Sequence, residues 1–516
     1  MKKILKLVFS RMTLVIVAIL LQFIVSLFLP YIINFYFPLK FNNVFVSIDL
    51  ILSIIALCVW ISVVNSDMPV EGQLVWAVLF LLFPIFGIMM YLLFVRRKPP
   101  RKHKKFYSKV SQEIKQYQQK SAEEDAELKK GLGKYYGQFQ YIYNATGQKT
   151  YKNTQVKYLR QGEIFCAELI EELKRAEKYI FMEYFIIEQG RFWNTILHTL
   201  KKKVLEGVEV RVMYDDLGTI NKLPTNYAKK LQSYGIKCVR FNYFAPIMSA
   251  VHNNRDHRKM TIIDGKVGFI SGLNLADEYV NLISPHGHWK DTGLKLKGDA
   301  VKSMLMMFLQ LYEVQNQKFE SFSNYIYNGN YDANSEGYVC PYGDGPKYFY
   351  EEYVAENVYL NLINNAQNYI WITTPYLIID NKLTTALTNA ARRGVDVRIV
   401  TPHIPDKKTI FCLTRSSYKN LKKAGVKILE YEKGFIHSKQ VLCDDDIAVV
   451  GTINFDYRSL LHHYECGVLM CKTPCLKDIK QDFEHIFNIC IDMKDFKQSP
   501  MLRLFSAIIK IFTPML

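Results

Sequence analysis

HRKMTIIDG occupies residues 257–265, and a second version of it, HSKQVLCDD, occupies residues 437–445. Both copies contain the pattern H-x-K-x-x-x-x-D, and an asparagine follows each one after a turn of small residues. The members are His257, Lys259, Asp264 and Asn274 in the first copy and His437, Lys439, Asp444 and Asn454 in the second. Two matches with the same sequel indicate a duplicated site rather than chance.

A longer repeat surrounds these motifs. AEKYIFMEYFII at residues 176–187 parallels AQNYIWITTPYLI at 366–378, and GVEVRVM at 207–213 parallels GVDVRIV at 394–400. Each half reads as strand, helix, strand, helix, strand, with strands that are apolar on both faces. This order predicts an α/β fold of two units related by a pseudo-twofold axis, each with a mixed sheet covered by helices.

The residue types in the motifs suit chemistry on a phosphodiester. In a strand, residues i and i+2 face the same side, so each His projects together with its Lys. Two imidazoles supply a nucleophile and an acid, while Lys259, Lys439, Asn274 and Asn454 would bind the phosphate oxygens. With charge supplied by lysine, neither a metal ion nor a cofactor is expected.

Asp264 and Asp444 complete the paired motif and so belong to the predicted catalytic set. Five residues beyond the lysine, each stands where its strand ends in a turn. We therefore expect both carboxylates to face away from the phosphate and to have a structural role.

Composition limits the possible partners. The chain has 516 residues, of which 49% are hydrophobic, and a formal charge of +18, which favours an anionic partner, nucleic acid or acidic phospholipid. Its ten cysteines show no disulfide framework. His462, His463, Cys466, Cys471 and Cys475 have zinc-ligand chemistry but lack the paired short spacings of a zinc ribbon, so we interpret them as ordinary strand and loop residues.

Three apolar runs, at residues 12–36, 45–64 and 74–95, are each long enough to cross a bilayer. They predict an N-terminal membrane anchor at 1–97 with two or three transmembrane helices. A charged helical linker is expected at 98–134, the two halves at 135–335 and 336–498, and an amphipathic helix at 499–516. Basic residues flank both the first and the third run, but the loop at 65–73 carries Asp67 and Glu71 and no basic residue, so we expect this loop to lie outside. This predicts a multi-pass protein of the cell membrane with its catalytic domain in the cytoplasm.

The paired motifs strongly resemble the phospholipase D superfamily and, within it, the bacterial cardiolipin synthases. The resemblance includes MEYFI at 182–186, YDDLG at 214–218, SGLNLADEY at 271–279, WKDT at 289–292, TTPYLI at 373–378 and NFDYRS at 454–459. The sequence departs from the family pattern at Asp256 and His463, where the family has Asn, and at Gly293, where His is common.

The resemblance implies a mechanism. His257 would attack phosphorus to form a phosphohistidine, and His437 would protonate the departing glycerol and then activate the hydroxyl of a second phosphatidylglycerol. Pseudo-symmetry leaves open which histidine is the nucleophile. Asp291 and Glu465 occupy the family positions for carboxylates that orient His257 and His437.

The expected partners are phosphatidylglycerol and anionic membrane lipid, and the membrane anchor argues against nucleic acid. A phospholipase D-type hydrolase, a transphosphatidylase with another acceptor, and a membrane scaffold without activity are the alternatives. The sequence does not determine the oligomeric state.

Overall fold

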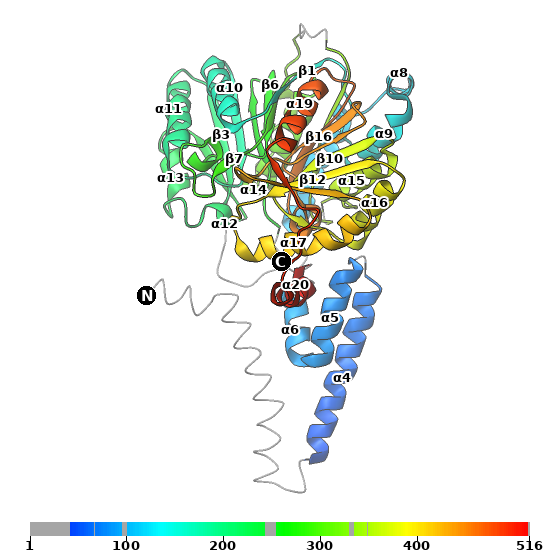
Figure 1. Ribbon diagram of the computed structural model, residues 1–516. Coiled ribbons are helices and arrows are strands. Elements are labelled where there is room, and N and C mark those ends of the chain that lie inside the picture. The colour runs from blue at the N-terminus through cyan, green and yellow to red at the C-terminus, as the bar shows by residue number, and fades with distance from the viewer. Residues whose placement is uncertain are drawn as a thin grey trace. The chain divides into compact units, whose positions relative to one another are not determined.

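The computed structural model describes residues 42–66, 68–94, 101–242, 254–329, 335–347 and 349–513 (Figure 1). They belong to two compact units. Unit 1 comprises Met1–Pro99, Phe244–Asn253 and Ala507–Leu516, and unit 2 comprises Pro100–Tyr243 and Asn254–Ser506. The two sequence repeats therefore lie together in unit 2.

In the described part of unit 1, the helices before residue 95 are α4 (Asn42–Val64), α5 (Val70–Leu82) and α6 (Pro84–Phe94). The apolar run at 74–95 was expected to form one helix, but the structure divides it at Phe83. Pro84 explains the break, because proline disfavours helical backbone at the residue before it, and Phe83 adopts φ −142° and ψ 71°. Trp76 and Tyr91 then pack together with ring centroids 5.3 Å apart.

Within the described ranges, no helix combines the length and the apolar composition needed to cross a membrane. The predicted transmembrane helices at 45–64 and 74–95 are therefore not confirmed. The predicted run at 12–36 lies outside the described residues.

Unit 2 contains one large sheet for each half of the repeat. The first has seven strands in the order β1-β8-β6-β5-β2-β3-β4, and the second has eight in the order β19-β13-β12-β10-β15-β16-β18-β9. The first-half strands are β1 (Thr154–Leu159), β2 (Tyr179–Tyr184), β3 (Glu209–Asp215), β4 (Lys237–Phe241), β5 (Lys259–Ile263), β6 (Val267–Ser271) and β8 (Gly293–Gly298). The second-half strands are β9 (Tyr338–Asp344), β10 (Tyr369–Thr373), β12 (Asp396–Pro402), β13 (Lys427–Tyr431), β15 (Gln440–Cys443), β16 (Ile447–Gly451), β18 (Glu465–Cys471) and β19 (Cys490–Asp492).

The two sheets have the same topology. Strands β2, β3 and β4 are parallel, as are β10, β12 and β13, while β5 and β15 each pair antiparallel to the first strand of their set. β1 and β9 close equivalent edges, and β19 is the one strand without a counterpart in the described part of the first half. The prediction of two equivalent α/β units with mixed sheets is confirmed.

Helices cover the outer faces of both sheets and also separate them. In Figure 1, α10 (Gly162–Arg175) and α11 (Arg191–Leu205) flank the first sheet, and α15 (Val354–Asn365) and α16 (Asn381–Arg392) flank the second. A hydrophobic cluster common to both halves contains α14 (Val301–Asn316) and α19 (Leu476–Phe487). α14 is buried on nearly all sides, as expected for a helix enclosed in a core.

The connector expected at 98–134 is helical but does not stand alone in solvent. α7 (Arg101–Tyr117) packs against α14 and buries Val110 and Ile114 in the common core. α8 (Ala122–Leu132) begins with a capping box formed by Ser121 and Glu124.

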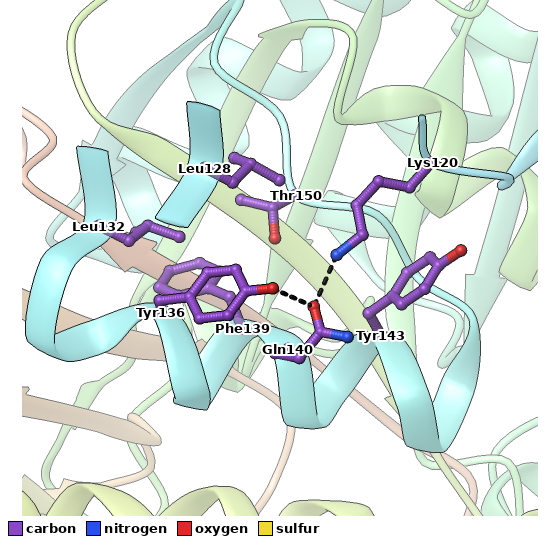
Figure 2. A pocket seen from close by; sticks show the side chains of 8 residues that line it. All are labelled: Lys120, Leu128, Leu132, Tyr136, Phe139, Gln140, Tyr143 and Thr150. Carbon is purple, nitrogen blue, oxygen red and sulfur yellow. Dashed lines mark hydrogen bonds between the residues drawn. The ribbon is translucent and has the colours of Figure 1, made fainter. Parts of the chain in front are cut away.

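α9 (Tyr136–Thr146) follows and packs on α15. Although α9 precedes the strands of the first half in the chain, it therefore packs against the second half. Figure 2 shows the small pocket between α8 and α9, where Lys120 donates to Gln140. At about 10 Å³ this pocket holds at most one water and is too small for a substrate.

Asp264 and Asp444 fasten the turns that end β5 and β15. Both have positive φ, 54° and 51°. The Asp444 carboxylate accepts hydrogen bonds from the backbone N–H groups of Gln367, Asn368 and Tyr369 at 2.8 to 2.9 Å. Asp264 binds the equivalent N–H groups of residues 177–179.

We therefore expect Asp444→Ala to lower the free energy of unfolding by about 3 kcal/mol, because three backbone donors lose a charged acceptor. Asp444→Asn is the matched control and should lose less, since Asn keeps one acceptor oxygen and tolerates positive φ. Thermal unfolding followed by circular dichroism measures the difference. Equal losses in the two variants would contradict this role.

Candidate active site

The two histidines lie where the halves interlock. His257 precedes β5, and its backbone N–H donates to the carbonyl of Tyr464 in the second half at 2.9 Å. His437 follows β14 (Gly434–Ile436), and its N–H donates to the carbonyl of Lys290 in the first half at 2.7 Å. β14 also pairs in parallel with β7 (His288–Lys290), which places one strand of each half in a small shared sheet.

Each histidine is held by a carboxylate from the other half. His257 Nδ1 lies 2.8 Å from Glu465 Oε1, and His437 Nδ1 lies 2.6 Å from Asp291 Oδ2. The family resemblance predicted both carboxylates, with Asp291 as the partner of His257 and Glu465 as the partner of His437. The structure shows the opposite pairing, because the strand exchange between the halves brings each histidine beside the other half's acid.

Further groups fix these two carboxylates. Ser459 Oγ donates to Glu465 at 2.6 Å, and Thr452 Oγ1 donates to its second oxygen. Asp291 accepts from the backbone N–H of Thr292 at 2.9 Å. Gly272 packs so closely against Asp291 that a Cβ there would lie 2.2 Å from Oδ1.

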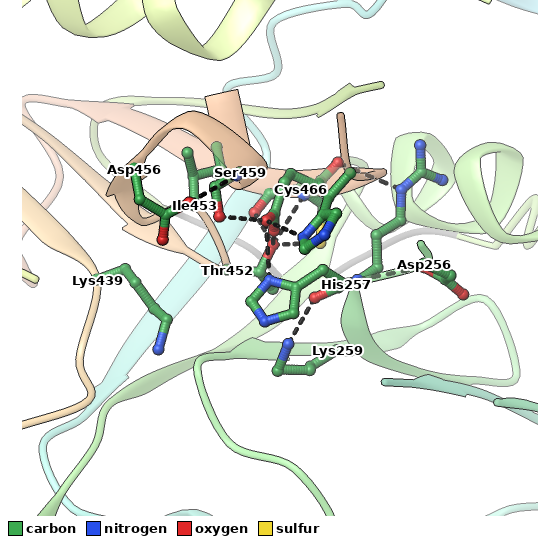
Figure 3. Close-up of polar contacts among 12 residues, drawn as sticks. Asp256, His257, Lys259, Lys439, Thr452, Ile453, Asp456, Ser459 and Cys466 are labelled. Atoms are coloured by element: carbon green, nitrogen blue, oxygen red, sulfur yellow. Dashed lines mark hydrogen bonds and ion pairs between the residues drawn. The ribbon is translucent and has the colours of Figure 1, made fainter. Parts of the chain in front are cut away.

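The lysines of the two motifs make equivalent hydrogen bonds to backbone. Lys259 donates to the carbonyl of His257 at 2.6 Å, and Lys439 donates to the carbonyl of His437. Both are almost completely buried. In Figure 3 the side chains of His257, Lys259 and Lys439 face one another across the site, so the structure brings the two motifs together.

Burial keeps the histidines neutral. It lowers the pKa of His257 well below its usual value, and the charge of Lys259 acts in the same direction. It also lowers the pKa of His437 to about 4, with Lys439 adding to the effect and Asp291 opposing it. When Nδ1–H donates to a carboxylate, the free lone pair of a neutral imidazole is on Nε2.

The other charges of the site respond to the same desolvation. Burial lowers the pKa of Lys259 to about 8 and that of Lys439 to about 7. Burial raises the pKa of Glu465 well above its usual range, opposed by Lys259 and by the two hydroxyl donors. Burial also acts to raise the pKa of Asp291, but His437 and Lys439 outweigh it and the net shift is downward.

The two predicted phosphate-binding amides differ. Asn274 accepts from the backbone N–H of Ile186 at 2.9 Å and donates to Tyr279 Oη at 2.8 Å. Tyr279 in turn lies against the His437 ring, with centroids 5.4 Å apart. Asn454 is buried, and its Oδ1 has no hydrogen-bond partner among the described residues.

The two motif aspartates and most of the residues considered as zinc ligands lie outside the candidate active site. Asp264 and Asp444 bind backbone at the far ends of β5 and β15, away from the motif lysines. The five residues considered as a zinc set do not converge either. Their three cysteines, Cys466, Cys471 and Cys475, are buried free thiols, whereas His463 lies beside His257 and Glu465.

Sequence reasoning did not identify Ser459, Thr452 or Tyr279 as site residues. Ser459 and Thr452 matter because they orient Glu465, and Tyr279 because it joins Asn274 to His437. Ser459 and Tyr279 stand within the quoted motifs NFDYRS and SGLNLADEY, but spacing alone gives no sign of which carboxylate or ring they contact.

The chain is similar to known proteins of one family over most of its length. The family described as "Cardiolipin synthase, PLD-like domain" matches residues 169–284 and 359–487, and "Phospholipase_D-nuclease N-terminal" matches residues 51–96. The cardiolipin synthase of Alkalihalophilus pseudofirmus is 33% identical over 86% of this chain and 88% of its own length. The chain belongs to the bacterial cardiolipin synthase family of the phospholipase D superfamily. It is accordingly a phosphatidyltransferase by family, as the resemblance implied.

Two other relatives place this cardiolipin synthase family member more broadly. An uncharacterized protein of Streptococcus mutans is 44% identical over 82% of this chain and 91% of its own. The solved phosphatidylserine synthase of Haemophilus influenzae has a TM-score of 0.57 at 16% identity, covering 74% of this chain and 100% of that one. The latter likeness shows a common fold.

Gly272→Ala tests the support of Asp291 in this family member. A methyl group 2.2 Å from Oδ1 has to displace the carboxylate, so His437 loses its orienting partner. We expect activity to fall at least tenfold, in line with the usual effect of losing such a partner. Gly137→Ala, where a Cβ meets nothing within 4 Å, is the control and should retain activity. Normal turnover by Gly272→Ala would contradict this role of Asp291.

The lysine pKa values predict how phosphate binding depends on pH. In the free protein, Lys439 carries its charge below about pH 7 and loses it as the pH rises. The KM for a phosphodiester substrate should therefore increase between pH 6 and pH 9. Lys439→Arg should shift that increase to higher pH, because guanidinium stays protonated. An unchanged KM profile in the variant would contradict the assignment of Lys439 to phosphate.

Proposed function

We propose that this protein synthesises cardiolipin by transferring a phosphatidyl group from one phosphatidylglycerol to another, with release of glycerol. The observation that carries the proposal is the crossed pair of carboxylate–histidine contacts beside two buried lysines. A phosphodiester needs a nucleophile, a proton donor and positive charge in one place, and this arrangement supplies each of them. The names of the relatives support phospholipid as the substrate class.

In the first step, Nε2 of His257 attacks phosphorus, and the bond from phosphorus to the glycerol oxygen breaks. His437 gives its Nε2 proton to that oxygen, so glycerol leaves neutral. The phosphodiester brings a negative charge, which raises the pKa of His437 and allows it to arrive protonated. The positive charge that forms on the phosphorylated imidazole of His257 lowers the pKa of Glu465, and the ionised carboxylate stabilises that charge.

In the second step, the roles of His437 reverse. It removes the proton from the hydroxyl of the second phosphatidylglycerol, whose oxygen attacks phosphorus as the bond to His257 Nε2 breaks. Lys259 and Lys439 balance the charge on the phosphoryl oxygens throughout. Asp291 assists His437 in both directions, because it holds Nδ1–H and leaves Nε2 to exchange the proton.

The assignment of His257 as nucleophile is supported by a difference between the pairs. Asp291 opposes the fall in the pKa of His437, and its own pKa is lowered, so this pair suits a group that gains and loses a proton. His257 lies among Lys259, Lys439 and His463, all of which favour its neutral form. A neutral imidazole is the form that attacks.

Transfer rather than hydrolysis is supported by the enclosure of the site. His257 is 8% exposed and His437 is 6% exposed, which limits the access of water to a phosphohistidine. A membrane location is supported by exposed apolar side chains. They include Leu50, Ile51 and Ile54 on α4, Leu74, Leu81 and Leu82 on α5, and Met501, Leu504 and Ile508 on α20 (Pro500–Phe512).

Incubation of the full chain in liposomes with labelled phosphatidylglycerol as the sole lipid substrate tests the proposal. Cardiolipin and free glycerol in equal amounts are the expected products. Phosphatidic acid would instead identify a phospholipase D-type hydrolase, and no turnover would identify a scaffold.

His257→Ala should lower the rate by at least a thousandfold, because a covalent nucleophile is lost. Exposed His198→Ala is the matched control and should remain active. A trapped phosphoryl group on His257 after acid quench would identify the nucleophile directly, and near-normal activity of His257→Ala would exclude it. Chelators should leave the wild-type rate intact.

A further inference from the structure

His463 is a buried residue that the reaction above leaves without a task. It is 7% exposed, and neither of its ring nitrogens has a hydrogen-bond partner among the described residues. Burying an imidazole without partners is unfavourable, since both nitrogens lose their hydrogen bonds to water. Burial accordingly lowers the pKa of His463 well below its usual value, so the imidazole stays neutral.

The ring of His463 lies beside His257 and Glu465. The ring of His463 lies 5.4 Å from that of His257, centroid to centroid. His463 Nδ1 is 3.9 Å from Glu465 Oε1, and His257 Nδ1 is 2.8 Å from the same oxygen. One ligand atom from each of the three residues lies within 4.8 Å of the other two.

This spacing suits a small divalent metal ion. Zinc binds histidine nitrogen and carboxylate oxygen at about 2.0–2.2 Å in tetrahedral geometry, so neighbouring ligand atoms stand roughly 3.3 Å apart. The separations of 2.8 and 3.9 Å lie on either side of that value. Small side-chain rotations would shorten the third separation, between the ring nitrogens of His257 and His463.

We propose that His257, His463 and Glu465 form an inhibitory zinc site that captures the catalytic histidine. In the active form, His257 carries its proton on Nδ1 and attacks with Nε2. Zinc bound at Nδ1 moves that proton to Nε2, and the lone pair needed for attack on phosphorus is lost. No oxidation or bond cleavage is involved, and removal of the metal restores the first tautomer.

The described neighbours of the other pair, His437 and Asp291, do not form an equivalent site. Glu465 and Asp291 occupy corresponding places, and two residues before each stand His463 and Trp289. The Trp289 indole packs on His437 with centroids 5.2 Å apart but offers no metal ligand. The proposed metal therefore binds beside His257 and leaves the His437–Asp291 pair unchanged.

Nearby charge weakens metal binding at this site. Burial raises the pKa of Glu465, so a metal ion has to displace the proton that this favours. The charge of Lys259 acts on both Glu465 and His257, and the charge of Arg458 acts on His463. Metal binding therefore competes with a neighbouring ammonium group, and we expect zinc to bind more weakly than in a structural site and to exchange reversibly.

Zinc and cobalt titrations of the full chain, purified in detergent without a polyhistidine tag, test this site. Wild type should bind one more equivalent of Zn²⁺ than His463→Asn, as measured by calorimetry. Co²⁺ should give visible absorption bands of tetrahedral coordination in wild type, and these bands should be absent from His463→Asn. His462→Asn, at the adjacent and less buried position, is the matched control and should behave like wild type.

Inhibition is measured separately as the ratio of rates without and with Zn²⁺ for each protein. We expect at least tenfold inhibition of wild type and of His462→Asn, less than twofold inhibition of His463→Asn, and full recovery with a chelator. Equal metal stoichiometry in wild type and His463→Asn would overturn the site. Loss of binding in His463→Asn with inhibition unchanged would overturn the blocking role.

The binding arm does not depend on the proposed function, because it needs no lipid. Only the inhibition arm rests on the assignment of His257 as nucleophile. A product other than cardiolipin, with the same zinc response, would refute the proposed function and leave this inference standing. His463→Gln provides a second variant if His463→Asn does not fold, as judged by circular dichroism.

Discussion

The exchange of carboxylates between the halves is the constraint on which the site depends. Glu465 of the second half contacts His257 of the first, and Asp291 of the first contacts His437 of the second. Such contacts inside a buried region are strong because little water competes for them. They also require that both sheets reach their final positions before either histidine is oriented. The geometry of the candidate active site is thus a property of the assembled pair of halves within unit 2.

Much of the fold could be predicted from the chain because the relevant patterns are local. The buried strands at 179–184 and 369–373 and the crossovers that follow them are evident from apolar runs and from the repeat itself. The alternation of His and Lys within each motif likewise predicted which side chains share a face. The positive φ at Asp264 and Asp444 agrees with the turn expected after each strand.

The features that the sequence did not predict depend either on two opposing local preferences or on contacts between residues far apart in the chain. Pro84 was visible in the apolar run at 74–95, but hydropathy gave no weight to its effect on the preceding residue. Val110 and Ile114 are spaced by one helical turn within a charged segment, and their contact with α14 decides their burial. The crossed partners of His257 and His437 could not be assigned, because spacing along one chain does not say which strands exchange. Ser459 and Thr452 were not predicted as partners of Glu465 for the same reason.

The small parallel sheet formed by β7 and β14 has an evolutionary consequence. Because one strand comes from each half, an ancestral single unit could have made the same pairing only with a second copy of itself, as a symmetric homodimer. Fusion of the two copies into one gene would then free each to diverge. The difference between Trp289 and His463, at matching places, shows that this divergence has reached the immediate surroundings of the catalytic rings. As a result, His437 has an indole beside it where His257 has an imidazole.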